Sequence, residues 1–580
     1  MDTIVQNVYG NLLSPERLLR RFKAMEDKKQ PWQTKWQEIQ DMTFPNVRDY
    51  SSSSSIAGRL TPQTSKIGVH CSAITGMITK TVSDLHSQIT DPMVKWIGLS
   101  FRKSPTVLTD GQVVSLSESP IVQQWLQQCE DSLYDLFADP RSNFYPSTFV
   151  FHRDWFTLGT ACRHICLRHD TGNIFFNCVS MADIFVDTDA YDQIETVARR
   201  YSLTAEQAYS LWGENIGQET LNLLGKDVGT TRKFEYIEMC LPTPAEVRNS
   251  DNPFAVAPYL SVVVGRRGKN IVSLAPEISL PYVVSRFDID PGGLYGRSLV
   301  WQSMPDITLM NRLSRRNVQA IDYASSPPIL TTTALSLNTR QIMPGAIVQG
   351  LDSEGRPQYL PMQMGSNIPI SIQFYQQKYT ELVDELLAND IIPQDAVGNM
   401  SPTEVIRREI QRNNRVRPVL VRLETEDLRF TLQRTLALLN AQGMLMPFPY
   451  NSLGLSPEQL PDPLNMIQIS FSGQMAKMRR LQDVQNINML MTLVMQYAQA
   501  DPSILQLLKL PEAVHEIADI YDIPKELIKT EEELAAEAEA QREAQEAQQA
   551  QQQEQEDLQK RMIEGQLEKE GISEEPEDLI

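Results

Sequence analysis

Residues 293–330 read GLYGRSLVWQSMPDITLMNRLSRRNVQAIDYASSPPIL, and this stretch decides how the chain is organised. We expect residues 299–325 to form one helix of about 40 Å, at a rise of 1.5 Å per residue. Pro327 and Pro328 end this helix, because proline lacks the backbone N–H that a helix interior requires. The Pro-Gly-Gly sequence at 291–293 marks a change from strand-rich sequence to long helices.

Three elements follow this stretch. They are a segment with short strands, a second helix expected to run antiparallel to the first, and a very long helix. Residues 329–370 combine scattered glycines and prolines with short β-like runs. Residues 371–389 (SIQFYQQKYTELVDELLAN) predict a second helix of about 28 Å. After a loop at 391–400, residues 401–404 (Ser-Pro-Thr-Glu) form a capping box that opens a helix of roughly 40 residues, about 60 Å long, with a kink at Pro418.

The N-terminal half predicts an α+β arrangement. Helices are expected after Ser14-Pro15, from about Trp32 to Thr43, and over 64–90, where apolar residues recur at helical spacing. Residues 159–170 (GTACRHICLRHD) and 174–179 (IFFNCV) predict a β-hairpin. The further runs FEYIEMCLP, YLSVVVGRRGKNIVSLAP and PYVVSRF complete a predicted antiparallel sheet, and KWIGLSF and MIQISF predict two more strands.

The composition indicates an ordinary water-soluble protein. The 580 residues are 41% hydrophobic and 22% charged, and no run of eighteen uncharged apolar residues occurs, so a membrane protein is not expected. The N-terminal residues lack the pattern of a signal peptide. Six cysteines are too few for a disulfide scaffold, so we expect reduced thiols in a cytoplasm.

The negative charge is concentrated in the last fifty residues. Residues 531–580 contain 17 acidic and 4 basic side chains, whereas the whole chain has a net charge of −20. This tail is rich in Ala, Gln and Glu, so it is either an exposed helix or a disordered brush, and we expect partial helix to about Glu570. This charge balance argues against a globally basic nucleic-acid-binding protein. It does not argue against a protein that contacts DNA without binding it tightly.

No motif assembles an active site, so an enzyme is not expected. Cys162, His164, Cys166 and His169 suit zinc as residue types, but their alternation indicates one face of an extended strand. The start of an HExxH motif at His515-Glu516 lacks its second histidine, and no P-loop or GxSxG motif is present. A metal-dependent nuclease built on the short pair Asp288 and Asp290 and this Cys/His strand remains a rival interpretation.

The order of these elements resembles the portal (head-to-tail connector) proteins of short-tailed, double-stranded DNA bacteriophages. The stretch quoted first is similar to the family's first stem helix. Three further regions carry the resemblance, and they are 21–45 (RFKAMEDKKQPWQTKWQEIQDMTFP), 399–443 (beginning NMSPTEV) and 473–534 (from GQMAKMRR to KTEEEL). A scaffolding protein or tail adaptor with long helices is the other rival, and it would lack two crossing stem helices.

The resemblance implies a ring of about twelve subunits at one capsid vertex, through whose axial channel double-stranded DNA enters during packaging and leaves during ejection. The terminase large subunit would dock during packaging, and tail adaptor proteins would replace it. Major capsid and scaffolding proteins are further expected partners. It implies a virion protein assembled in the host cytoplasm, with no cofactor, bound metal or membrane contact.

The implied fold is α+β, with an α/β wing, a two-helix stem, a small β-containing clip, a long kinked wing helix and a helical crown. Along the chain the assignment is wing 1–296, first stem helix 297–326, clip 327–370, second stem helix 371–390, tunnel loop 391–400, wing 401–474, crown 475–530 and acidic tail 531–580.

The tunnel loop would meet DNA in the channel. Twelve copies would carry a net charge of about −240, which repels phosphates and lets DNA slide. The residues expected to act there are Asp390, Pro393, Gln394, Asp395, Gly398 and Asn399. The residues alone fit an ordinary connector between two helices equally well, and the resemblance favours the tunnel loop.

The stem and clip supply the remaining candidates. Arg312, Arg315 and Arg316 lie on the first stem helix and either form a positive belt that faces DNA or the capsid, or pair with acids on the second stem helix of a neighbouring subunit. We favour the second interpretation, and the acids are Glu381, Asp384 and Glu385. Lys378 on the second stem helix, and Arg340 and Arg356 in the clip, are weaker candidates.

Overall fold

The computed structural model describes thirteen segments of the chain and two single residues. They are 13–44, 71–92, 95–101, 106–109, 112–115, 119–168, 170–244, 257–325, 329–331, 359–361, 368–388, 418–453 and 463–471, with Leu490 and Val494. The chain divides into two units, 1–475 and 476–580, and all thirteen segments belong to the first. The predicted tunnel loop and acidic tail lie outside the described residues, as does the predicted crown apart from Leu490 and Val494.

The first described helix is longer than the sequence predicts. Helix α2 (Pro15–Thr43) is continuous and contains Pro31, whereas two helices with a break before Trp32 were expected. A proline inside a helix removes one backbone hydrogen bond and costs about 3 kcal/mol. Burial on both sides of the proline offsets this cost, because Phe22 packs in one apolar cluster and Trp36 in another.

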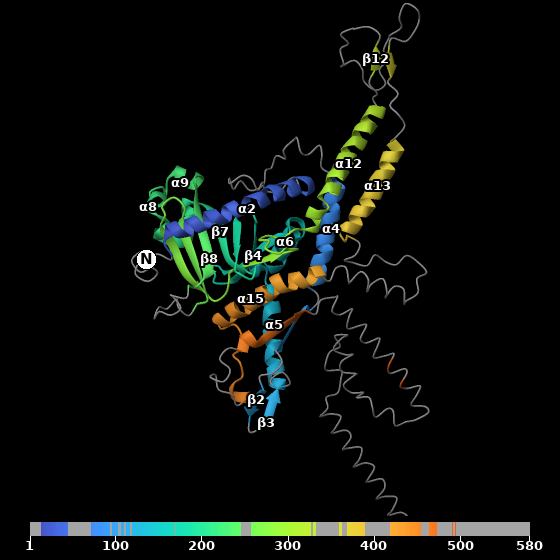
Figure 1. The fold of residues 1–580 in the computed structure, drawn as a ribbon. Coiled ribbons are helices and arrows are strands. Elements are labelled where there is room, and N and C mark those ends of the chain that lie inside the picture. Colours follow the sequence, from blue (N-terminus) through green and yellow to red (C-terminus); the bar gives the residue numbers. More distant parts are fainter. Residues whose placement is uncertain are drawn as a thin grey trace, which may run out of the picture. The chain divides into compact units, whose positions relative to one another are not determined.

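A five-stranded antiparallel sheet forms one half of this unit. Its order is β10-β9-β8-β7-β6, as Figure 1 shows in part. The strands are β6 (Ile184–Thr188), β7 (Ile194–Thr204), β8 (Lys233–Pro242), β9 (Tyr259–Gly265) and β10 (Ile271–Glu277). The predicted antiparallel pairing is confirmed, but the strands form two sheets rather than one, and the predicted strand PYVVSRF belongs to the second sheet.

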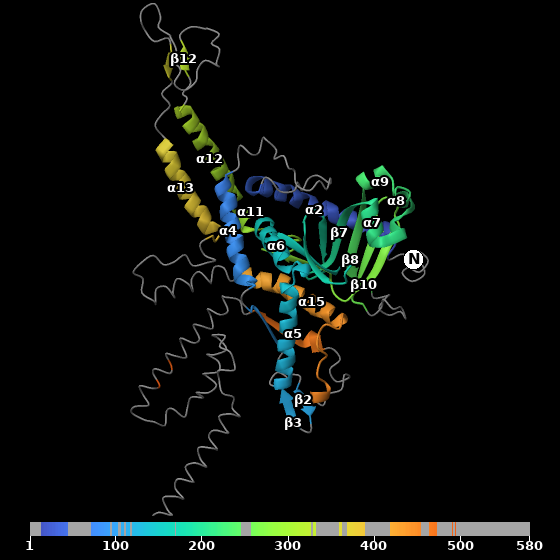
Figure 2. The same cartoon turned by 180° about the vertical axis from the view of Figure 1, so that it is seen from behind.

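The two faces of this sheet are covered by different helices. Helix α2 packs on one face, where Phe22 meets Phe185 edge-to-face at 4.6 Å. The other face is covered by α7 (Ala205–Trp212) and the short helix η3 (Gly213–Ile216), and Figure 2 shows α7 beside β7. Successive side chains of β8 point to opposite faces of the sheet. Ile237 packs in the cluster under α2, and Tyr236 packs in the cluster under α7.

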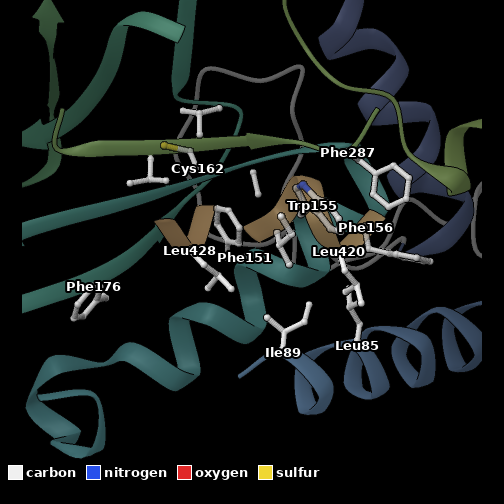
Figure 3. Packing of buried hydrophobic residues seen from close by; sticks show 14 of the residues in the cluster. Leu85, Ile89, Phe151, Trp155, Phe156, Cys162, Phe176, Phe287, Leu420 and Leu428 are labelled. Carbon is white, nitrogen blue, oxygen red and sulfur yellow. The ribbon is translucent and has the colours of Figure 1, made fainter. Parts of the chain in front are cut away.

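A three-stranded antiparallel sheet of order β11-β4-β5 forms the other half. It contains the predicted hairpin, β4 (Thr160–Leu167) and β5 (Ile174–Val179), with β11 (Tyr282–Arg286) on the free side of β4. Helices α6 (Phe144–Leu158) and α4 (Ser72–Ile89) pack in the same cluster, and Figure 3 shows Phe151 and Trp155 of α6 within it.

A close backbone approach fixes the end of α6. Gly159 caps the helix with φ of +84°, and a Cβ there would lie 2.5 Å from the carbonyl oxygen of Gly296. Only glycine fits this conformation and this distance. The contact holds the start of β4 against the segment that leads into the long helices.

Strand β1 (Ile97–Phe101) pairs with β14 (Ile467–Phe471), so sequence positions more than 360 residues apart are joined. Helix α5 (Pro120–Ala138) covers the other edge of β1 with side chains. The Tyr134 hydroxyl accepts hydrogen bonds from the backbone of Trp96 at 2.6 Å and Ile97 at 2.7 Å. The edge is therefore closed to further strand pairing.

Several short elements complete the described structure. They are β2 (Thr106–Thr109), β3 (Gln112–Ser115), η2 (Pro140–Ser142), α8 (Gln218–Leu221), α9 (Asp227–Thr231), η6 (Asn451–Leu453) and η7 (Pro463–Met466). Among the helices of the described segments, none has the length and apolar character that a membrane crossing requires.

Candidate functional site: the paired helices α12 and α13

Two long helices lie side by side, as both Figure 1 and Figure 2 show. The first is α12 (Met304–Ser325), preceded by the short helix α11 (Leu299–Gln302), and the second is α13 (Ile368–Glu385). A single helix over 299–325 was expected, but a turn at Ser303 divides it. Pro305 explains the division, because it has no N–H to donate to the carbonyl of Trp301.

Helix α13 begins three residues earlier than predicted and ends earlier. Pro369 lies in its first turn, where the missing N–H costs nothing. The helix ends at Glu385, and Leu387 beyond it has a left-handed φ of +56°, which a right-handed helix does not adopt. Short β-strands β12 (Ile329–Thr331) and β13 (Tyr359–Pro361) pair between the two helices in sequence, in agreement with the expected β-containing excursion.

Polar contacts show that α12 and α13 run antiparallel. Lys378 of α13 lies 3.5 Å from Asp306 near the start of α12, and 2.6 Å from Glu381 on its own helix. Ser371 near the start of α13 donates a hydrogen bond to Asn317 of α12 at 2.5 Å. Hydrogen bonding to Glu381 raises the pKa of Lys378, and the pKa of Glu381 is lowered in return.

The base of the helix pair is fixed by a buried asparagine. Asn311 of α12 is fully buried, its Oδ1 accepts a hydrogen bond from the Cys71 backbone at 2.6 Å, and its Nδ2 donates to the Met42 carbonyl at 3.3 Å. Cys71 also lies 3.2 Å from the hydroxyl of Tyr375 on α13. Through its two hydrogen bonds, Asn311 therefore connects α12 to the C-terminal end of α2 and the N-terminal end of α4.

We expect Asn311→Ala to lower the free energy of unfolding by about 2 kcal/mol, because it leaves a buried N–H and a buried carbonyl without their partner. Equilibrium urea unfolding measures this loss. Asn317→Ala is the matched control on the same helix, where we expect a loss below about 1 kcal/mol. Equal losses in the two variants would contradict the role of Asn311.

The three stem arginines are exposed. Arg312, Arg315 and Arg316 have no ion pair with any residue of the described segments. The exposed acids Asp384 and Glu385 on α13 are likewise unpaired within those segments. Lys378, expected to be a weaker candidate, is engaged inside the chain instead.

The sequence analysis did not predict that α12 and α13 expose apolar side chains. Val318 of α12 is 56% exposed, and Ile370 of α13 is 66% exposed. Ile372 and Phe374 of α13 are also exposed. The helical spacing of Ile370 and Phe374 was a signal in the sequence, but only the structure reveals that no described segment covers these side chains.

The helix that follows, whose described part begins at Pro418, carries a feature that the sequence does not predict. Residues Glu424–Leu428 form a π-helical turn, and α15 (Arg429–Ala441) continues from it. Such turns occur mostly as single interruptions of an α-helix, frequently at functional sites. The predicted capping box at 401–404 lies outside the described residues, so the kink at Pro418 remains a prediction.

The π-helical turn places two acids against the three-stranded sheet. Asp427 and Arg163 of β4 are both fully buried and form an ion pair at 2.9 Å. Glu426 accepts a hydrogen bond from the backbone N–H of Arg286 at 2.7 Å and pairs with its guanidinium at 3.2 Å. These contacts fix the long helix to β4 and β11.

A pair of histidines lies near Arg163. The Nδ1 atoms of His86 and His152 are 3.2 Å apart, between α4 and α6. Burial, followed by the charge of Arg163, lowers the pKa of His86 to about 4, and burial holds that of His152 well below its usual range. Both imidazoles are therefore neutral at physiological pH, which allows one to donate to the other.

The residues of the rival enzyme interpretation do not form a site. Asp290 pairs with Arg297 at 2.7 Å, and Asp288 forms a backbone bridge to the same residue. His164 stacks on Tyr282 with ring centroids 4.4 Å apart. Within the segments that the structure describes, no three His, Cys, Asp or Glu side chains gather around a common point, and His169 lies outside them.

Eight of the predicted site residues cannot be placed. They are the tunnel-loop residues Asp390, Pro393, Gln394, Asp395, Gly398 and Asn399 and the clip residues Arg340 and Arg356, all of which lie outside the described residues. Their roles therefore remain predictions.

Comparison with known proteins identifies the class. Residues 15–528 match the family of bacteriophage head to tail connecting proteins, so the chain belongs to this family. The chain is 21% identical over 531 residues to the portal protein of Salmonella phage epsilon15, covering 90% of this chain and 89% of that one. It is 20% identical over 528 residues to the probable portal protein of Bordetella phage BPP-1, covering 88% of each.

These matches confirm the resemblance stated from the sequence. Head-to-tail connectors are structural proteins of the phage particle, so the expectation that the chain is not an enzyme is confirmed as well. The described segments are a mixture of helices and antiparallel sheet, which agrees with the predicted α+β class.

Proposed function

We propose that this chain is a portal subunit that forms a ring of about twelve copies at one capsid vertex. The observation that carries the proposal is the antiparallel pair α12 and α13, joined through β12 and β13, within a chain that belongs to the connector family. The ring is a conduit for double-stranded DNA in packaging and ejection. The protein is thus a virion component, assembled in the host cytoplasm.

In this proposal α12 and α13 are the stem, and the residues between them are the clip, which was predicted as 327–370 and loses its last three residues to α13. The two sheets and the helices packed on them, with the long helix and β14, form the wing (1–296 and 401–474). Residues 391–400 are the tunnel loop, 475–530 the crown and 531–580 the acidic tail. The clip binds the terminase large subunit and later the tail adaptors, and the outer surfaces meet capsid and scaffolding proteins.

The unpaired surfaces of the stem support contacts between copies. Exposed arginines lie on α12 and exposed acids on α13, so neighbouring stems can pair α12 of one copy with α13 of the next. The exposed Val318 and Ile370 would be covered in the same contact. This arrangement favours intersubunit ion pairs over a positive belt that faces DNA.

Electron microscopy and solution mass measurement of the purified protein test the proposal. We expect a ring with an axial hole and a mass of about 790 kDa, twelve times the 65.8 kDa chain. A monomer that stays monomeric at high concentration and binds stoichiometric zinc would instead support the rival metal-dependent nuclease.

Charge exchange tests the stem contacts. We expect Arg315→Glu combined with Arg316→Glu to weaken ring association at least about tenfold, because like charges then face each other. Adding Asp384→Arg and Glu385→Arg restores pairing and association. Native mass spectrometry measures the ring fraction, with the surface variant Arg141→Glu as control. A stable ring that packages DNA poorly would favour the positive-belt interpretation.

A further inference from the structure

A cavity of about 770 Å³ lies between the end of β4, the connection from β10 to β11, and α15. Its volume falls within the range of small-molecule sites. Apolar side chains form much of the wall, and three of them, Leu167, Leu211 and Ile278, are also partly exposed to solvent. None of the described residues that line the cavity lies on α12 or α13.

One carboxylate of the lining is held by hydroxyl groups. Glu238 of β8 accepts hydrogen bonds from Tyr282 at 2.6 Å, from Tyr201 at 2.7 Å and from Ser261 at 2.7 Å. Burial opposes its ionisation. The pKa of Glu238 is nevertheless lowered, by the charge that His164 carries when protonated and by these hydrogen bonds. At neutral pH His164 is uncharged, so the hydrogen bonds from the hydroxyl groups are what favour the carboxylate form there. Glu238 is therefore a carboxylate anion at neutral pH.

The other charges of the lining are paired with each other. Arg434 of α15 binds Glu277 at 2.9 Å, and Arg168 binds Asp170 at 2.6 Å. Glu238 has no ion pair within 4 Å among the described residues. It is the lining carboxylate whose negative charge has no direct cationic partner.

Two basic groups near Glu238, Arg199 and His164, form no ion pair with it. Arg199 lies opposite Glu238 on β7 and interacts with its charge through space, but its guanidinium donates to His164 at 3.3 Å and lies over the ring of Tyr201 at 4.3 Å. Arg199 is not among the described residues that line the cavity. Burial, followed by the charge of Arg199, lowers the pKa of His164 to about 3, so this imidazole is neutral. The lining thus offers an anionic acceptor beside an apolar wall.

We propose that this cavity binds a protonated primary amine on an unbranched aliphatic chain. The ammonium group lies at Glu238, and its chain lies along Leu167, Leu211 and Ile278. Three hydroxyl groups already orient the carboxylate, so the site is preorganised for a small cation. Such an amine is either a free small molecule or the side chain of a lysine on another protein.

Calorimetric titration of the full-length protein tests the site with four probes. We expect n-pentylamine and Nα-acetyl-lysine methylamide to bind, and 1-pentanol and pentanoate to bind at least about tenfold more weakly, because they lack the positive charge. Tighter binding of pentylamine supports a free amine as the natural ligand, and tighter binding of the lysine derivative supports a protein side chain. Equal binding of pentanol and pentylamine would overturn the proposal.

Three variants locate the binding. Glu238→Gln removes the charge and is expected to weaken amine binding at least about tenfold. Ala437→Phe, at a half-buried position of the lining on α15, fills the cavity without altering Glu238, and it should abolish binding in a folded protein even where Glu238→Gln is poorly folded. Glu206→Gln, an exposed acid on α7, is the control with unchanged affinity. Amine binding that persists in the Ala437→Phe variant would refute the site.

Discussion

Replacing Asp427 by asparagine is expected to lower the free energy of unfolding by about 3–5 kcal/mol. The substitution keeps the size of the side chain but leaves the guanidinium of Arg163 buried without its anion. Arg163 depends on this one partner, because its Nε and one terminal nitrogen make no hydrogen bond within the described part of the chain. The rings of Phe144 and Phe151, 5.4 and 4.8 Å away, offer only cation–π contacts. Equilibrium denaturation measures the loss.

An exposed ion pair serves as the control that distinguishes the effect of burial from the effect of the ion pair itself. Asp170 and Arg168 approach more closely, at 2.6 Å, but both are about half exposed, so Asp170→Asn should cost less than about 1 kcal/mol. The double variant Arg163→Met with Asp427→Leu removes both charges and should recover most of the stability that Asp427→Asn loses. Equal losses in Asp427→Asn and Asp170→Asn would show that the buried pair does not carry the expected penalty.

The parts of the fold that the sequence predicted depend on local patterns. The hairpin of β4 and β5 follows from alternating residues around Thr171-Gly172-Asn173, and helix α4 from apolar residues at helical spacing. Strand and turn propensities act over a few residues, so they can be read without knowing the rest of the chain. The order of α12, a β-containing excursion and α13 was predictable for the same reason.

The errors arise where distant packing outweighs a local signal. Pro31 suggested a break, yet α2 is continuous because its two halves are each buried in a different cluster. Conversely, Pro305 lay within a predicted helix and marks a real break, even though Val300 and Ile307 on its two sides are buried in one cluster. A proline in the sequence therefore does not by itself tell whether a helix continues through it.

The contacts that hold the candidate site were beyond prediction for a related reason. Arg163 and Asp427 are 264 positions apart, and nothing in either local sequence indicates burial or pairing. The same applies to Asn311, a polar residue in a helical pattern that turns out to be fully buried. The exposed arginines on α12 were predictable as a cluster, but their lack of partners within the described segments was not.

Acid is expected to destabilise the protein through its buried histidines. His86 has a pKa of about 4 in the folded protein and about 6.5 when unfolded. Between these values the unfolded chain binds a proton that the folded one does not, so stability falls as pH falls from 6.5 to 4. His86 alone accounts for about 3 kcal/mol by pH 4. His164, with a pKa of about 3, acts in the same direction.

A single variant isolates this contribution. Buried carboxyls such as Glu130 and Asp154 have a raised pKa and act in the opposite sense, so the total acid effect is a balance. His86→Gln removes one titrating group. Between pH 7 and pH 4, we expect the free energy of unfolding of this variant to fall by about 3 kcal/mol less than that of the wild type. Urea unfolding at both pH values gives the difference, and an NMR titration of His86 checks its pKa directly. The same loss in both proteins would mean that His86 titrates as an exposed histidine, and the close approach of His86 to His152 would then not persist in solution.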